Sequence, residues 1–168
     1  MSNKSHWENI YETKTPADVS WTQDYPQTSV DLITKSKINK GDSIIDIGGG
    51  DSTLVDSLLE LGYTNLTVLD ISSKSIARAK SRLGAKSNLV TWIDADITQF
   101  VPDKKYGLWH DRAAFHFLTH SNDIKRYASK VSASAEYLVL GTFSTNGPLK
   151  CSGLPITQYN KASLNNVF

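Results

Sequence analysis

The sequence predicts an α/β fold with a doubly wound, mostly parallel sheet. Three observations favour this class. Short apolar segments rich in β-branched residues alternate with segments of helical period along residues 27–143. A glycine-rich turn at residues 48–50 follows the first of these apolar segments and precedes a helical one. Acidic residues stand at or just past the ends of three successive predicted strands, at Asp46, Asp70 and Asp96.

Each element follows from its own pattern. Apolar, β-branched runs predict the strands, and apolar residues spaced by three or four predict the helices. The predicted strands cover residues 43–47, 65–70, 89–93, 106–110 and 137–143. The predicted helices cover residues 27–38, 53–62, 74–83 and 122–131, with a short helix or turn at 111–118 and a short helix near 161–165.

Three parts of the chain differ in character. Residues 1–25 are a polar N-terminal arm with spaced aromatics, residues 26–143 are the predicted core, and residues 144–168 are a loop-rich C-terminal segment. The last segment is too short for a further long helix and two full strands. We therefore expect a sheet whose C-terminal strand hairpin is missing or shortened, which leaves the last strand as an exposed edge.

Composition limits the classes of function. The chain has 168 residues, 39% hydrophobic and 21% charged, which is ordinary for one globular domain. A net charge of +1 gives no bulk attraction to nucleic acid or to an anionic membrane. The single cysteine, Cys151, excludes an internal disulfide and fits the cytoplasm. Neither a signal peptide nor a membrane-spanning segment is predicted.

The glycine turn admits two ligand classes. A nicotinamide dinucleotide fingerprint requires G-x-G-x-x-G, but Thr53 stands where its third glycine should be. The pattern Asp46-x-Gly48-x-Gly50 fits a ligand with a cationic amino-acid end, such as S-adenosylmethionine (SAM), because an acid at this place attracts an ammonium group and repels a pyrophosphate. A turn without any ligand is the plainer alternative.

The other two acids extend the same interpretation. A carboxylate at the end of the second strand, Asp70, can accept hydrogen bonds from both hydroxyls of a ribose. An acid past the third strand, Asp96, can accept from an adenine amino group. The alternatives are a helix cap for Asp70 and an ordinary Asp turn for Asp96. In the arm, Trp7, Tyr11 and Trp21 either pack on the domain or close over the ligand.

With these motifs together, the chain resembles class I, seven-strand SAM-dependent methyltransferases of the Rossmann-like type. The carrying stretches are Asp46-x-Gly48-x-Gly50, Asp70, Asp96-Ile97, Trp109-His110-Asp111-Arg112 and residues 147–155. A narrower resemblance, to a bacterial subgroup, is carried by Trp7-x3-Tyr11, Asp18-Val19-Ser20-Trp21, Trp109-His110-Asp111-Arg112-Ala113 and residues 147–155. The spacing Trp7-x3-Tyr11 with Trp21 is also similar to protein-lysine methyltransferases. Gly107, where an acid is usual, is a departure.

The resemblance implies a cofactor site with these residues: Trp7, Tyr11, Trp21, Asp46, Gly48, Gly50, Asp70, Ile71, Asp96, Ile97 and His110. It also implies methyl transfer from SAM, leaving S-adenosylhomocysteine, to a protein side chain such as lysine or to a small molecule. No set of His, Cys and Asp residues has metal-ligand spacing, so no metal is expected.

If the acceptor is an amine, its proton must leave, and His110 or Asp111 are the predicted catalytic residues. His116 is a third candidate, although a packed histidine is the simpler interpretation. A non-catalytic SAM-binding module, or a subunit completed by another chain, is the alternative function. An uncovered fifth strand would allow a homodimer through that edge.

Overall fold

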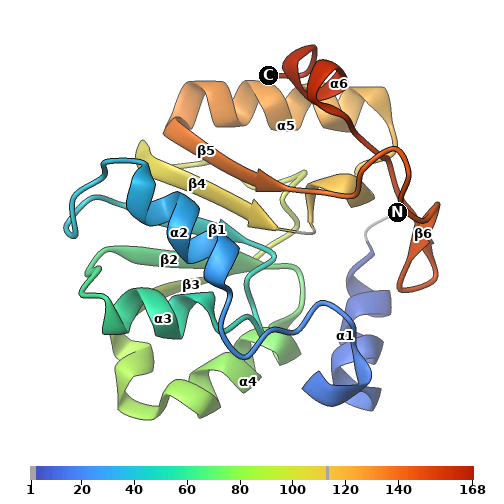
Figure 1. Ribbon diagram of the computed structural model, residues 1–168. Helices are drawn as coiled ribbons and strands as arrows, with labels where there is room; N and C mark the ends of the chain where they lie inside the picture. The colour runs from blue at the N-terminus through green and yellow to red at the C-terminus, as the bar shows by residue number, and fades with distance from the viewer. Residues whose placement is uncertain (1–2, 113) are drawn as a thin grey trace.

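Five parallel strands form the central sheet (Figure 1). The computed structural model describes residues 3–112 and 114–168. The strand order is β3-β2-β1-β4-β5. The chain adds β2 and β3 on one side of β1 and then β4 and β5 on the other, so the topological switch point lies between β1 and β4. The strands are β1 (Ile44–Ile47), β2 (Leu66–Asp70), β3 (Val90–Asp94), β4 (Tyr106–Arg112) and β5 (Ala135–Gly141).

Helices cover both faces of the sheet, as the apolar residues of the central strands require. On one face lie α2 (Gln27–Lys35), α3 (Leu54–Glu60) and α4 (Ser73–Leu83), whose apolar residues share a core cluster with Ile44 and Leu108. On the other lie α5 (Ser121–Ser134) and α6 (Lys161–Asn165), whose apolar residues share a cluster with Ile45 and Trp109. Successive residues of a strand thus enter opposite cores.

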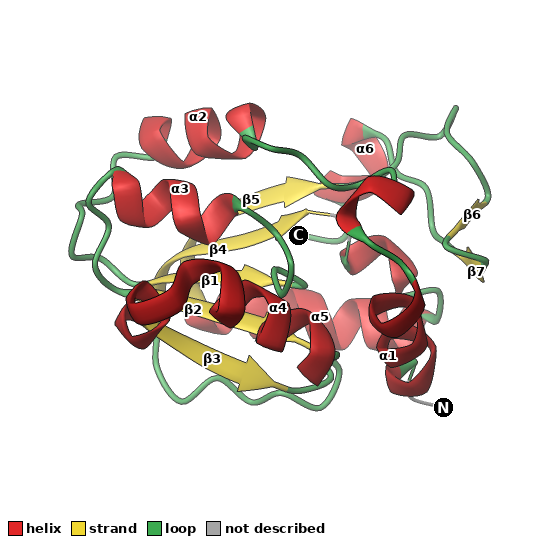
Figure 2. Ribbon diagram, turned by 90° about the horizontal axis from the view of Figure 1, so that it is seen from below, coloured by secondary structure: helices red, strands yellow, loops and turns green. Residues whose placement is uncertain are grey.

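The remaining elements gather at the carboxyl ends of the strands. Both views place α1 (Lys4–Thr13) and a small hairpin of β6 (Lys150–Cys151) and β7 (Leu154–Pro155) at the end to which the strand arrows point (Figures 1 and 2). Three short 3₁₀ helices complete the chain: η1 (Pro16–Asp18), η2 (Gly84–Leu89) and η3 (Phe115–Phe117). The arm and the C-terminal segment therefore frame the edge where ligands bind in such sheets.

The predicted fold class is confirmed, with corrections at element ends. The short helix or turn expected at residues 111–118 is wrong in its first part, because β4 continues through Arg112 and only η3 is helical. The helix expected at 27–38 ends at Lys35, and the one expected at 122–131 extends over Ser121–Ser134. The C-terminal helix lies where it was predicted.

Among the described residues, no strand pairs with the outer edge of β5, so the parallel sheet ends there. Tyr137 on this strand is exposed, and Leu138, Val139 and Leu140 are only half-buried. No helix in the described ranges is long and apolar enough to cross a membrane.

Candidate functional site

The glycine turn after β1 packs directly on acidic side chains. A Cβ atom on Gly49 would lie 2.1 Å from Asp46 Oδ2, and one on Gly50 would lie 2.8 Å from Asp70 Oδ2. Gly48 has a φ of +68°, a conformation that side chains with a Cβ rarely adopt. At Gly49 and Gly50, carboxylates of the first two strands fill the adjacent space.

Asp70 is the last residue of β2 and is held from both sides. Its Oδ2 accepts a hydrogen bond from Gly50 N at 3.0 Å, and its Oδ1 accepts one from Ser72 N at 2.8 Å. Burial raises the pKa of this carboxyl to about 6, although these hydrogen bonds oppose the shift. Since each carboxylate oxygen has a second lone pair, Asp70 can still accept two hydroxyl groups.

Asp46 forms a buried chain of contacts with β4 and α2. Asp46 and His110 are register partners in neighbouring strands, and both face α2. His110 Nδ1 lies 2.7 Å from Asp46 Oδ1, and His110 Nε2 lies 2.9 Å from Ser29 Oγ. A carboxylate only accepts, so Nδ1 carries the proton. The other carboxylate oxygen, Asp46 Oδ2, is buried and has no partner among the described residues.

Asp111 faces the opposite core and is fully enclosed. It accepts hydrogen bonds from the backbone N–H groups of Ala114 and Phe115 and from Tyr127 Oη at 2.6 Å. Burial raises its pKa to about 6. The position follows from the corrected end of β4, since Asp111 is a strand residue whose register partners are Ile47 and Leu140. Its side chain therefore links η3 to α5 through hydrogen bonds.

Both predicted catalytic side chains are therefore fully engaged. The two ring nitrogens of His110 contact Asp46 and Ser29, and the oxygens of Asp111 accept from η3 and Tyr127. Every polar atom of the two side chains already has a partner in this structure, and Asp111 Oδ2 alone keeps a lone pair by the count applied to Asp70. A direct catalytic role for His110 or Asp111 stays a prediction that this geometry disfavours.

The third acid is less central than its spacing indicated. β3 ends at Asp94, two residues before Asp96, and Lys4 Nζ lies 2.5 Å from Asp94 Oδ1. Asp96 Oδ1 accepts from Thr98 N and Thr98 Oγ1, which makes an Asp turn. Among the described residues its side-chain bonds stay in this loop. Ile71 and Ile97, the neighbours of Asp70 and Asp96, are both half-buried.

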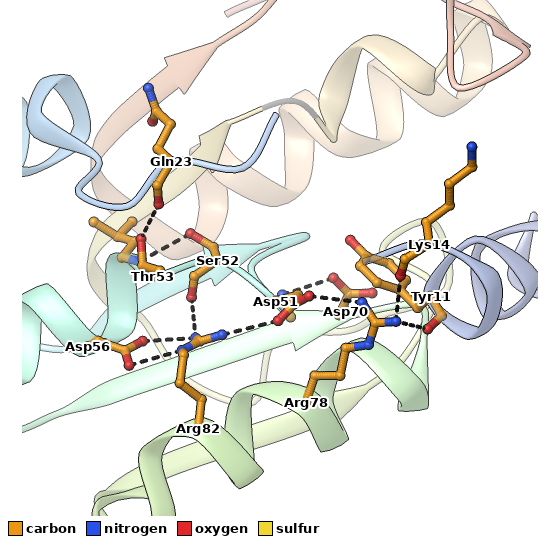
Figure 3. A network of polar contacts seen from close by, with 12 residues as sticks. Tyr11, Lys14, Gln23, Asp51, Ser52, Thr53, Asp56, Asp70, Arg78 and Arg82 are labelled. Atoms are coloured by element: carbon orange, nitrogen blue, oxygen red, sulfur yellow. Dashed lines mark hydrogen bonds and ion pairs between the residues drawn. The ribbon is translucent and has the colours of Figure 1, made fainter. Parts of the chain in front are cut away.

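The aromatic residues of the arm do come together. The Trp7 ring lies 6.4 Å from Tyr11, 6.1 Å from Trp21 and 5.1 Å from Phe117, measured between centroids. Tyr11 lies beside Asp70 (Figure 3), and its pKa is raised, first by burial and then by the charge of Asp70. The arm thus covers the end of β2.

Glu8 and Arg78 fix the arm to the core, and sequence reasoning missed both. Glu8 accepts hydrogen bonds from Ser73 N at 2.8 Å, Ser72 Oγ at 3.0 Å and Lys74 N at 3.2 Å, at the N-terminus of α4. Burial opposes the ionisation of Glu8, but the bonds from the two serines and from Lys74 N outweigh it and lower its pKa. No local pattern signals these contacts, because the partners lie 64 to 66 residues apart.

Arg78 joins three segments in the network of Figure 3. Its guanidinium donates to the backbone oxygens of Tyr11 and Lys14, at the end of α1, and to Asp51 Oδ2 in the glycine turn. Arg82, one turn along α4, binds Asp51 and Asp56. The arm and the glycine turn are therefore held by the same helix.

The surface has two hollows of note, one at the amino ends of the strands and one that reaches the carboxyl edge at Ser73 and Asp94. One of about 360 Å³ is lined by residues such as Lys105, Gly107 and Glu136, at the amino ends of β4 and β5. One of about 230 Å³ lies between α4 and β3, beside Lys80 and Trp92. Neither is lined by a predicted cofactor residue.

A family model described as "Methyltransferase domain" matches residues 44–135, more than half of the chain. The chain is 28% identical over 102 residues to malonyl-[acyl-carrier protein] O-methyltransferase 2 of Ilyobacter polytropus, a match that covers 60% of this chain and 39% of that protein. It is 24% identical over 113 residues to the eEF1A lysine and N-terminal methyltransferase of Mus musculus, covering 67% of this chain and 16% of that protein.

Among solved structures, the chain is similar to an S-adenosylmethionine-dependent methyltransferase from Clostridium acetobutylicum. The TM-score is 0.63 at 17% identity, and the match covers 85% of this chain and 58% of the other. The fold is thus shared, while the chain spans only 39%, 16% and 58% of the lengths of the three proteins named here.

Proposed function

Because this chain belongs to the methyltransferase-domain family, we propose that it is a SAM-dependent methyltransferase with an acceptor still to be identified. The observation that carries the proposal is Asp70. A buried carboxylate ends β2, touches the amide of Gly50 in the glycine turn, and keeps two lone pairs for the hydroxyls of a ribose.

The other predicted residues take roles around it. The unpartnered Asp46 Oδ2, next to the turn at Gly49, is suited to the ammonium end of SAM. His110 holds Asp46 in place through the other oxygen. Ile71 would pack beside the ribose, and Asp96 with Ile97 would reach the adenine. Gly48 and Gly50 shape the turn. Trp7, Tyr11 and Trp21 would cover the cofactor.

The proposed chemistry is an in-line methyl transfer. SAM supplies an electrophilic methyl group on a sulfonium, which leaves as neutral S-adenosylhomocysteine. The chain's contribution is to hold the methyl group and the nucleophile at contact distance and to exclude water with the arm. Malonyl-carrier and lysine methyltransferases are among its relatives, so a carboxyl or an amine acceptor is compatible with the family.

Replacing Asp70 by asparagine should weaken SAM binding about 5- to 150-fold, which corresponds to about 1–3 kcal/mol. Asparagine keeps the size of the side chain but loses the charge and one acceptor oxygen. Isothermal titration calorimetry with SAM and with S-adenosylhomocysteine measures the loss. An unchanged dissociation constant would show that the ribose is bound elsewhere.

The pH dependence gives an independent check on Asp70. Its pKa of about 6 in the folded protein lies above the ordinary value, so the folded state holds this proton more tightly than the unfolded chain. The stability that protonated Asp70 contributes to the fold is therefore lost as the pH rises from about 4 to about 6. SAM affinity, which needs the ionised form, should increase over about pH 5–7. Both slopes should be smaller in Asp70→Asn.

We also propose that residues 1–25 act as a lid that opens to admit SAM. The bonds of Glu8 to the N-terminus of α4 hold the lid closed. Glu8→Ala should make cleavage by trypsin after Lys14 about 5- to 30-fold faster, since it removes about 1–2 kcal/mol of helix-terminus binding. Glu12→Ala on the same helix is the matched control, because Glu12 is exposed and its ion pair in the described part of the chain is with Lys74. Equal rates of trypsin cleavage for the wild type, Glu8→Ala and Glu12→Ala would contradict the lid.

A second candidate function follows from the uncovered edge of β5, where no strand pairs among the described residues. A non-catalytic SAM-binding subunit, or a homodimer joined through β5, would cover Tyr137 and its neighbours. SAM binding without methyl transfer into a cell extract would favour the first, and a molar mass of one chain in solution would exclude the second. A cytoplasmic location is the accompanying proposal, supported by the free thiol of Cys151.

A further inference from the structure

His116 is a buried polar side chain that the preceding roles leave unexplained, and both of its ring nitrogens lack a partner among the described residues. It lies in η3 and is 1% exposed. A buried imidazole left without partners destabilises a fold, since both nitrogens lose their bonds to water. Such a group needs a reason beyond packing, because an apolar ring of similar size would avoid the cost.

The position of His116 suits the acceptor side of the site. η3 follows β4 at the carboxyl edge of the sheet, and Asp111 at the end of β4 fixes it through Phe115 N. His116 and the predicted methyl-donor residues thus share one edge. The oxygen of His116 accepts from Thr157 N at 2.7 Å, which joins η3 to the C-terminal segment.

Two aromatic rings pack against that of His116, and one of them also contacts the arm. The centroid of its ring lies 4.4 Å from that of Phe117 and 4.9 Å from that of Phe143. Phe117 in turn packs against Trp7 of the lid at 5.1 Å. Opening of the lid would therefore remove Trp7 from Phe117, which is one of the two rings that pack against His116. The faces of such rings attract a cation.

The protonation state of His116 is compatible with accepting a hydrogen bond. Burial lowers the pKa of this imidazole to about 4, so the ring is neutral near pH 7. A neutral imidazole offers one acceptor nitrogen and one donor N–H. The acceptor nitrogen can therefore accept a hydrogen bond from the N–H of an uncharged nucleophile, and the lone pair of the nucleophile stays free to attack the methyl group.

We infer that the methyl acceptor is an amine, and that His116 is a catalytic residue that accepts a hydrogen bond from the attacking nitrogen. The inference rests on the proposed function, since it names the substrate class of that same site. Phe117, Phe143 and Trp7 would line the approach of the amine.

The transfer step balances as follows. The lone pair of the neutral amine forms the new N–C bond, the C–S bond breaks, and its electron pair stays on sulfur. The nitrogen becomes a methylated ammonium, whose proton passes to water after the lid opens. Positive charge grows on the nitrogen during the step, so the N–H bond to His116 and the ring faces bind the transition state more tightly than the ground state.

The test compares His116→Phe with His116→Asn. Phenylalanine keeps an aromatic ring but removes the acceptor atom, whereas asparagine keeps an acceptor oxygen. We expect His116→Phe to lower methyl transfer about 100-fold, with unchanged SAM binding in calorimetry and a higher melting temperature. His116→Asn should retain more activity than His116→Phe. His120→Phe is the matched control, because His120 is exposed in the next loop.

The assay uses SAM with a tritiated methyl group and a bacterial cell extract, and the labelled products are hydrolysed in acid and separated by cation exchange. Label in N-methyl amines that His116→Phe abolishes supports the inference. Label released as methanol by mild base, or a His116→Phe protein as active as the wild type, overturns it and leaves the proposed function intact. Failure of the wild-type protein to bind SAM, or to transfer the label at all, overturns both.

Discussion

Replacing His110 by leucine should lower the free energy of unfolding by about 3–5 kcal/mol, the largest single effect that we expect in this protein. His110 is 3% exposed and is the only described partner of the Asp46 carboxylate. Leucine fills similar space but leaves the carboxylate buried without any hydrogen bond, next to the glycine turn. Urea unfolding followed by circular dichroism measures the loss from the midpoint.

Two further variants separate the effect of the buried charge on stability from the effect of packing. Asp46→Leu combined with His110→Leu removes both polar groups, so the double variant should be more stable than His110→Leu alone. Ser29→Ala removes only the hydroxyl that contacts the far ring nitrogen, and should cost about 1 kcal/mol. If His110→Leu lost less than Ser29→Ala, the contact with Asp46 would not be what holds β1, β4 and α2 together.

The pairing of Asp46 with His110 also shows how far the sequence alone could reach. Alternation along a strand can place Asp46 on the face of Ile44, and His110 on the face of Leu108. What local patterns do not contain is that β1 and β4 are neighbours in a register that sets these two residues opposite one another. An acid that binds a ligand and one that binds a histidine look the same in a strand.

The prediction for the end of β4 was also wrong because of contacts between residues distant in the sequence. The predicted end of β4 at His110 came from its apolar run, and the next two residues are charged. Asp111 nonetheless continues the strand, because Tyr127 of α5 and two backbone N–H groups satisfy its carboxylate in the core. Asp70 was predicted correctly as the end of β2, because its apolar run and the following Ser72 cap are both local. An element end can be predicted where its signals are local, as at Asp70, and is missed where a distant partner decides it, as at Asp111.

Replacing Gly50 by alanine should cost about 2–3 kcal/mol of stability and weaken SAM binding at the same time. The added Cβ would lie 2.0 Å from Ser75 Oγ, 2.7 Å from Ser75 Cβ and 2.8 Å from Asp70 Oδ2. Ser75 cannot turn away freely, because its hydroxyl donates to Ser72 O at 2.8 Å inside the first turn of α4. The glycine turn and α4 must therefore separate, which moves the amide of Gly50 away from Asp70.

Two glycines of the same chain provide controls for that result. Gly41→Ala meets nothing within 4 Å and should leave stability within about 0.5 kcal/mol. Gly62→Ala also meets nothing, but its φ of +85° should cost about 1 kcal/mol through backbone strain alone. Gly50 does not have a positive φ, so a loss there larger than in Gly62→Ala measures the contact with α4 and Asp70. A loss as small as in Gly41→Ala would mean that the turn gives way easily, and that Asp70 does not depend on Gly50 for its position.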